Sequence, residues 1–479
     1  MKLKHVLFCL LMVSSAASAQ NLMGISGSPY GGTNSLHLNP AFMADSPHSF
    51  YLNLAAGNAH LNNNYVRYNG PYSLLAFALG RIPDQYKRPD GSLLFKVDYT
   101  EEMLNGREKS GSLLAELRGP SAMLRVSDQV VIGLTTRLRT ANQFKNADEE
   151  LLSVIRLGLK DDQIYNIPNR NNQFSFNSNT FTEVGVALAA TVLENDYQKI
   201  SLGATVKRVR GLASGHLINR GLNYRILSDP STNDVYFQVD QLNAELGYTT
   251  YLGRKGRSLR LRDVFDNNNP GRGWGLDLGL SYQLIDEDDA SRYRLRLGAS
   301  LMDMGSVRYY DADRKEVERY RIEETNSRFS EEDFFGVKNS DDLVDVLREG
   351  LDLTPATNTG EYRSGLPTAL VLSADMLVSG NLYLSGVLIQ DMRPRFAVTM
   401  HQPSLLSVTP RYETPRFGLA LPVTYLNQAL VVGGLVRLGP FFAGSDNLLG
   451  LIGSSSSRFR PRGADVYAGL SFSALRQKP

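Results

Sequence analysis

Strict alternation of apolar residues with small or polar ones is the feature that most constrains how this chain folds. In residues 273–285, apolar side chains occupy every second position, with Gly, Asp, Ser or Gln between them. A period of two places all the apolar side chains on one face of a β-strand. Strands in soluble sheets average about five or six residues. An uninterrupted run of this length therefore favours a strand that is long enough to cross a membrane.

The same period recurs along the chain, which predicts many strands rather than one. Alternating runs cover residues 130–139, 183–192, 201–207, 293–301 and 465–473. Some connections are tight, as at Ser127-Asp128, and others are long and polar, which is typical of antiparallel transmembrane barrels. We predict an all-β chain, a transmembrane antiparallel β-barrel of about 14 strands, within a range of about 12 to 16. A soluble β-sandwich or propeller is the alternative, but no repeat of propeller length is visible.

Composition is consistent with a barrel and excludes other classes. The chain has 479 residues, with 51 Lys and Arg against 49 Asp and Glu, and no apolar run long enough for a transmembrane helix. Near-balanced charge argues against binding nucleic acid through its phosphates. A barrel spreads its lipid-facing residues over alternate positions, so a negative mean hydropathy does not contradict a membrane location.

Residues 1–19 resemble a secretory signal peptide. Lys2 and Lys4 precede a short apolar run, and Ala17-Ser18-Ala19 forms a small-residue cleavage site, which predicts cleavage before Gln20. Cleavage would remove Cys9, the only cysteine, and leave a chain with 49 basic and 49 acidic residues. We therefore expect export to the outer membrane and a mature protein without thiols.

Three segments depart from the strand pattern. Residues 20–47 are rich in Gly, Asn, Ser and Pro, and we expect them to form a plug-like segment before a barrel that spans residues 48–479. Residues 147–160 and 330–351 carry apolar residues at helical spacing after acidic starts, which predicts two short helical inserts in long loops. These inserts would either cover one end of the barrel or dock a partner.

The N-terminal segment and the C-terminal region carry a family resemblance. Asn39-Pro40-Ala41-Phe42-Met43, just before the first strand, resembles the hatch segment of the long-chain fatty-acid transporter (FadL-like) superfamily of outer-membrane barrels. Residues 439–447 and 464–470 resemble a family of uncharacterised Gram-negative outer-membrane proteins within that superfamily, related to the shuttle barrel of type nine secretion. The resemblance implies a 14-stranded barrel with its N-terminal segment inside the lumen. Phe42 stands where those transporters have Gly.

The non-apolar faces of the strands predict the lining of the lumen. We expect balanced charges there, paired with one another and anchoring the plug, rather than a ring of one sign that would select ions. The predicted lumen charges are Arg137, Arg139, Glu183, Lys207, Asp277, Arg294, Arg296, Asp375 and Asp465. As a test of inside and outside, Leu278→Arg on the lipid face should cost about 2 to 4 kcal/mol, and Asp277→Ala on the lumen face much less.

No catalytic or metal-binding constellation is visible. The five histidines after residue 19 do not occur at spacings typical of metal ligands or activated nucleophiles, and the chain has no phosphate-binding glycine loop. We expect neither an enzyme nor a bound cofactor or metal.

Two functional hypotheses follow. The first is a barrel that binds or passes a small hydrophobic or amphipathic molecule, as the resemblance implies. The second is an accessory barrel that docks envelope or secreted proteins. Membrane lipid is an expected partner under both hypotheses, and nucleic acid under neither. An apolar pocket between residues 20–47 and the barrel wall would favour the first hypothesis, and a lumen filled with ion pairs the second.

Overall fold

A computed structural model describes residues 22–89, 93–159, 164–229, 234–249, 269–287, 289, 292–311, 316–335, 337, 340–354, 357–457 and 459–476. The predicted signal peptide, residues 1–19, lies outside this part of the chain. The described helices are α2 (Met23–Ser26), α3 (Phe42–Asp45), α4 (Leu74–Ala78), α5 (Glu149–Leu157), α7 (Ser340–Gly350) and α8 (Leu448–Ile452). Short 3₁₀ segments span Pro29–His37, Asp84–Tyr86, Val97–Tyr99 and Glu332–Phe334.

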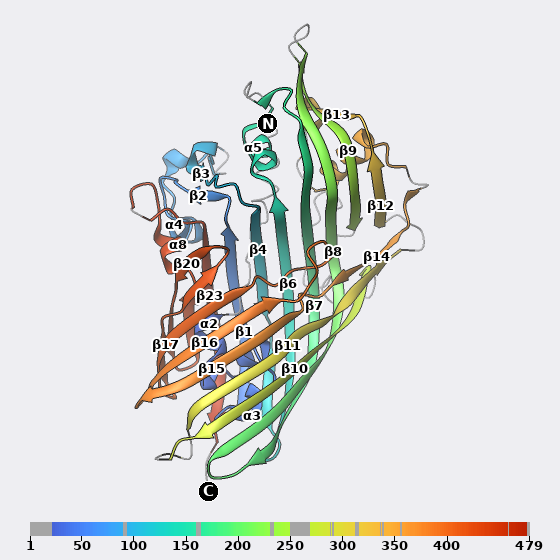
Figure 1. The fold of residues 1–479 in the computed structure, drawn as a ribbon. Coiled ribbons are helices and arrows are strands. Elements are labelled where there is room, and N and C mark those ends of the chain that lie inside the picture. The colour runs from blue at the N-terminus through green and yellow to red at the C-terminus, as the bar shows by residue number, and fades with distance from the viewer. Residues whose placement is uncertain are drawn as a thin grey trace.

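The described strand segments form one antiparallel sheet that closes on itself as a 14-stranded barrel, which confirms the predicted fold class (Figure 1). The first and last strands close it by pairing over most of their length. In chain order the strands are β1 (His48–Asn63), β4 with β5 (Lys109–Arg118, Ser121–Arg125), β6 (Val130–Ala147), β7 (Asn169–Glu194), β8 (Gln198–Asp229), β9 with β10 (Asp234–Thr249, Gly271–Ile285), β11 with β12 and β13 (Tyr293–Tyr310, Val317–Glu324, Ser327–Ser330), β14 with β15 (Glu361–Gly365, Ala369–Ser379), β16 (Leu382–Asp391), β17 (Leu405–Glu413), β18 with β19 (Phe417–Ala420, Val423–Leu426), β20 with β21 (Ala429–Val432, Gly434–Leu438), β22 (Phe441–Ser445) and β23 (Gly463–Leu475). A separate two-stranded sheet pairs β2 (Val66–Tyr68) with β3 (Thr100–Glu102).

Several of the fourteen strands are interrupted, and the pairing shows why their segments count as one. The C-terminal half of β8 pairs with β9, where Gly215 opposes Tyr248. Its N-terminal half pairs with β10, where Gly211 opposes Gly271. Pro120 lies at the break between β4 and β5, and Pro422 at the break between β18 and β19. Proline has no N–H to donate to a neighbouring strand, so ladder pairing is interrupted there.

The two ends of the barrel differ in their connections. One end carries tight turns, such as the one between β15 and β16, and β23 runs down to this end (Figure 1). The opposite end carries α4, α5, α8 and the two-stranded β2–β3 sheet (Figure 1), and α7 contacts β13 at the same end. Both predicted helical inserts are therefore present, and both lie at the long-loop end. Among the described residues, no helix is long and apolar enough to span a membrane.

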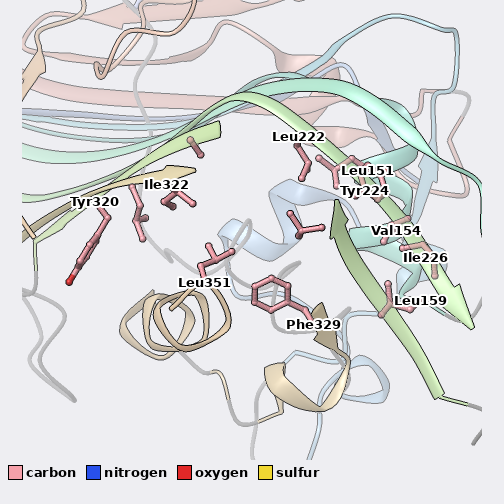
Figure 2. Close-up of a cluster of buried hydrophobic side chains, with 13 residues drawn as sticks. Leu151, Val154, Leu159, Leu222, Tyr224, Ile226, Tyr320, Ile322, Phe329 and Leu351 are labelled. Carbon is pink, nitrogen blue, oxygen red and sulfur yellow. The ribbon is translucent and has the colours of Figure 1, made fainter. Parts of the chain in front are cut away.

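The long-loop end continues into a curved sheet that rises above the barrel. The upper parts of β7 and β8, together with β9, β12 and β13, form this extension (Figure 1). Its concave face carries an apolar cluster that contains Leu151 and Val154 of α5 and Leu351 after α7, and Figure 2 shows these side chains gathered against β8 and β12. The helical inserts thus pack against strand extensions, which gives this end its own small core.

The outer face of the barrel presents an apolar belt. Outward residues on β7 and β10 are highly exposed, with 63% exposure for Val186, 60% for Trp274 and 45% for Leu278. From Trp274 to Tyr282 the strand covers about 27 Å, and at a tilt of about 40° this approaches the apolar height of roughly 25 Å that transmembrane barrels present. The predicted assignment of faces on β10 is confirmed, since Asp277 is buried beside the exposed Leu278.

Candidate functional site in the lumen and barrel wall

The N-terminal segment lies inside the lower half of the barrel, where α2 and α3 are surrounded by strands (Figure 1). Most side chains between residues 22 and 48 are buried. Wall residues bond to its backbone along its whole length: Ser300 Oγ donates to the Leu38 carbonyl at 2.7 Å, and Lys199 Nζ to the Ala44 carbonyl at 2.8 Å. At its start, the Met23 N–H donates to Asp446 Oδ2 at 3.0 Å.

The Asn39-Pro40-Ala41 turn packs directly against the wall. Asn39 Oδ1 accepts the Ala41 N–H at 2.9 Å, and Asn39 Nδ2 donates to the Leu280 carbonyl at 2.9 Å. Gly279 makes this approach possible, because a Cβ at that position would lie 2.0 Å from Asn39 Oδ1. The side chain of Asn39 therefore both shapes the turn and binds it to strand β10.

The two residues after this turn fill apolar and aromatic contacts. The Arg296 guanidinium lies 4.1 Å from the centroid of the Phe42 ring, and Phe42 also joins a buried cluster with Met23 and Leu38. Met43 is fully buried in a second cluster between the segment and β5, β6 and β7. Side chains of the segment and the wall are packed together here.

A network of four basic and four acidic side chains lies on the inner face of β4 to β11, at mid-height in the lumen. Arg137 Nη2 lies 2.5 Å from Glu183 Oε2, and Arg139 Nη1 lies 2.8 Å from Asp303 Oδ2. Lys207 Nζ contacts Asp277 at 2.6 Å and also pairs with Asp303. The eight residues are Glu116, Arg118, Arg137, Arg139, Glu183, Lys207, Asp277 and Asp303, all buried.

Two smaller polar clusters lie elsewhere on the inner face. Asp375 Oδ2 accepts from Arg411 at 2.8 Å, from Arg296 at 3.2 Å and from the Tyr293 hydroxyl at 2.6 Å. On β23, Asp465 Oδ1 accepts the Asp446 N–H at 2.7 Å, and His60 Nδ1 lies 3.4 Å from Asp465 Oδ2. Within the described residues, no group of three or more His, Cys, Asp or Glu side chains is placed to hold a metal ion.

The loop between β16 and β17, residues 392–404, crosses the lumen above the charged network. Gln143 on β6 exchanges two hydrogen bonds with the backbone of His401, at 2.7 and 2.8 Å. Met400 is buried in a cluster with Leu114, Phe181 and Val209 from the far wall. The N-terminal segment, the charged network and this loop therefore lie inside the barrel at three successive levels along its axis.

The outer wall has a hollow of about 500 Å³ between β1, β4 and β21 to β23. Small residues on neighbouring strands create it: Ala55, Gly57, Ala443, Ala468 and Gly469. The exposed side chains of Leu117, Leu438 and Phe441 surround it, so it lies within the apolar belt. Its lining includes Phe442, which packs inside the wall with Leu22 and Ile25 of the N-terminal segment.

A sequence profile described as a family of unknown function (DUF5723) matches residues 40–446. The chain belongs to this family. The match begins at Pro40 of the wall-contacting turn and ends at Asp446, the residue that accepts the Met23 N–H. A search of curated proteins gave no significant match.

Solved structures similar to this DUF5723 member are barrels at low identity. The toluene transporter TbuX of Ralstonia pickettii is 8% identical, with a TM-score of 0.40, over 95% of this chain and 98% of that chain. The toluene transporter TodX of Pseudomonas putida is 8% identical, with a TM-score of 0.33, over 95% and 96%. A Pseudomonas aeruginosa FadL homologue is 11% identical, with a TM-score of 0.31, over 92% and 94%. At these identities and TM-scores, the likeness does not identify a substrate for this chain.

Most of the predicted lumen residues of this DUF5723 chain lie together on the inner face. Arg137, Arg139, Glu183, Lys207 and Asp277 share the central network; Arg296 and Asp375 share the second cluster, and Asp465 belongs to the third. Arg294 does not join them. Pairing of β11 with β10 skips Arg294 beside Tyr293, and this bulge leaves its side chain exposed.

Sequence reasoning missed several members of these clusters. Glu116 and Arg118 occur in a short alternating run with Leu113, Ala115 and Leu117, and this alternation could have placed both residues on the inner face. Asp303 gave no such signal, because it lies at a positive φ of 53° in an irregular part of β11 that period two does not describe. The lumen-crossing loop 392–404 was also missed, since no local pattern tells whether a polar loop folds inward.

Proposed function

We propose that this protein is an outer-membrane barrel that binds a small hydrophobic or amphipathic molecule and lets it pass through the side of the barrel wall. The observation that carries the proposal is the lipid-facing hollow of about 500 Å³. It is a shallow hollow, open to the lipid and lined almost entirely by apolar side chains, which suits a ligand with an apolar body. A molecule dissolved in the lipid phase would reach it without crossing water.

An ion-paired lumen was expected for an accessory barrel that docks proteins, but here the pairs lie only in the axial path, and the apolar hollow in the wall supports a lateral route. A solute that travelled along the axis would have to displace buried ion pairs such as Arg137 with Glu183, and loop 392–404 as well. Breaking paired charges in a poorly solvated interior is costly. At the hollow, by contrast, the groups between lipid and the N-terminal segment are Phe442, Ala56 and Gly469.

The contacts behind the hollow indicate how binding would reach the plug. Leu22 and Ile25 pack with Ala56, Leu435 and Phe442 in one apolar cluster. A ligand with an apolar body can replace these contacts at little cost, because its own apolar surface is buried in the exchange. We infer that residues 20–47 act as a plug whose first helical turn is the part that the ligand meets.

Two glycines provide a matched test of this proposal. Gly57 lines the hollow, and a Cβ there would meet other atoms only at 3.8 Å. Gly386 on β16 is also in an outward register, and a Cβ there would be 4.0 Å from its nearest neighbour. Gly57→Leu should fill the hollow, whereas Gly386→Leu should leave it open, with the same added volume on the same kind of surface.

The measurement is binding of a fluorescent long-chain fatty acid to the purified barrel in detergent, followed by uptake into proteoliposomes. We expect Gly57→Leu to weaken binding at least about tenfold and to slow uptake, while Gly386→Leu matches the unaltered protein. Equal binding by the two variants, or no uptake above protein-free liposomes, would overturn the proposed lateral route.

A further inference from the structure

Four arginines lie directly opposite one another on four neighbouring strands of the outer wall. Arg272 on β10 opposes Arg210 on β8 and Arg308 on β11, and Arg308 opposes Arg363 on β14. At a strand spacing of about 4.8 Å, the row is about 14 Å long. We refer to Arg210, Arg272, Arg308 and Arg363 as the arginine row.

The row points away from the lumen. In each strand the residues before and after the arginine are buried, as Val307 and Tyr309 are on either side of Arg308. Three of the four arginines are exposed, and Arg210 is half-buried. The guanidinium groups therefore belong to the outer surface of the barrel.

The height of the row places it at the edge of the apolar belt. Trp274, two residues further down β10 and 60% exposed, is the uppermost belt residue of that strand, and Arg208 lies over its ring at 4.8 Å. Two residues correspond to about 7 Å along the strand, or about 5 Å in height at a tilt of about 40°. Aromatic residues mark the membrane interface of barrels, and the polar headgroup layer extends roughly 5 to 7 Å beyond the hydrocarbon.

Such a row is unfavourable for the barrel alone. Like charges that face each other across neighbouring strands destabilise a sheet. Arg308 makes a bidentate pair with Glu361, at 2.6 and 2.7 Å, but Glu361 is one carboxylate beside several guanidinium groups. Arg210 and Arg272 take part in interactions of their own. What distinguishes the row is that four arginines lie side by side at the level of the lipid headgroups; the proposal does not depend on any of them being unpaired.

We propose that the arginine row binds the phosphate groups of lipid headgroups in the leaflet at the long-loop end of the barrel. Guanidinium groups present paired N–H donors that match phosphate oxygens, and several in a row can hold one headgroup bidentately or bridge two. Phosphate-bearing lipid places these anions at the depth where the row lies. This inference rests on the membrane-spanning barrel and does not depend on the proposed lateral route.

The test compares two double variants with a matched control. Arg210→Gln with Arg272→Gln, and Arg308→Gln with Arg363→Gln, each remove two charges from the row. The control is Arg225→Gln with Arg328→Gln, which removes two arginines from the strand extension above the barrel, where Arg225 pairs with Asp240 and Arg328 with Gln238. Heat-modifiable migration of each variant establishes that its barrel is folded before binding is measured.

Binding is measured by native mass spectrometry of the full mature chain in neutral detergent. The probes are phosphatidylglycerol, an uncharged galactosyl diacylglycerol and inorganic phosphate. We expect phosphatidylglycerol to be retained by the unaltered protein and the control, at least about tenfold less by each row variant, and less at high salt. Equal retention of the uncharged lipid, equal loss in the control, or a preference for inorganic phosphate over the lipid would overturn the assignment.

Discussion

Arginines inside the lumen and arginines on the outer wall are neutralised in different ways. Inside, Arg137 and Arg139 each lie within 4 Å of Glu116, Glu183 and Asp303. Outside, Arg272 and Arg308 face other arginines across the sheet. The inner charges are balanced by the protein itself, because burial there would make an unpaired charge costly. On the outer wall Arg308 pairs with Glu361, but like charges still face each other along the row, so an anion from the surroundings can add to the balance.

This difference separates structural charge from charge available for binding. Removing one inner carboxylate leaves several buried cations without one of their partner charges. Removing one outer arginine changes a half-solvated surface where ion pairs contribute little. We therefore expect the largest change in the free energy of unfolding where a substitution removes a carboxylate that pairs with buried cations, and the smallest where it removes an outer arginine.

The largest effect is expected for Asp303→Asn. Asp303 contacts Arg137, Arg139 and Lys207, and Asn tolerates its positive φ of 53°, so the backbone can stay as it is. We expect a loss of about 3 to 5 kcal/mol in the free energy of unfolding, because three buried cations lose a shared partner. Urea unfolding followed by heat-modifiable migration measures it. A loss below about 1 kcal/mol would mean that the lumen is wet enough to screen these charges.

A second pair of substitutions compares the two faces of one strand. Leu278→Arg should cost about 2 to 4 kcal/mol by placing a charge in lipid. The sequence predicted a much smaller cost for Asp277→Ala, on the reasoning that the lumen face is hydrated. The structure changes that expectation: Asp277 is buried, pairs with Lys207 at 2.6 Å and accepts the Asp303 N–H at 2.7 Å. We now expect a cost of about 3 kcal/mol, similar to that of Leu278→Arg.

Period two was sufficient to predict the strands and their faces, since it depends only on local side-chain direction. It failed where a bulge changed that direction. Arg294 was placed in the lumen and is exposed, and Asp303 was overlooked although it is central to the network. Both lie at irregularities of β11, and a bulge is set by pairing with neighbouring strands rather than by the residues alone.

The sites could be predicted less well than the fold, because they depend on segments that are distant in sequence. The hollow is formed by small residues from the beginning and the end of the chain, such as Gly57 and Ala443. The arginine row was also invisible: each arginine occupies an ordinary outward position, and only the register brings the four side by side. Alternation gives the face of a residue but not its neighbours across the sheet.

An intermediate effect is expected where the N-terminal segment meets the wall without charge. In Gly279→Ala the new methyl group would lie 2.0 Å from Asn39 Oδ1 and 2.8 Å from Pro40 Cδ. We expect a loss of about 1 to 3 kcal/mol through overpacking, together with faster proteolysis within residues 22–47. Gly386→Ala is the control, because its Cβ would meet nothing closer than 4.0 Å. Unchanged proteolysis in Gly279→Ala would argue that the segment does not depend on this contact.

The smallest effect is expected for Arg363→Gln, and here the sign is informative. Arg363 directly opposes Arg308, so losing its charge removes repulsion within the arginine row. In neutral detergent we expect unfolding to become harder by about 0.2 to 1 kcal/mol. In bilayers that contain phosphatidylglycerol the gain should vanish or reverse, because the unaltered row is then stabilised by lipid phosphate. The same stabilisation in both environments would show that lipid does not balance the outer charges as the protein balances the inner ones.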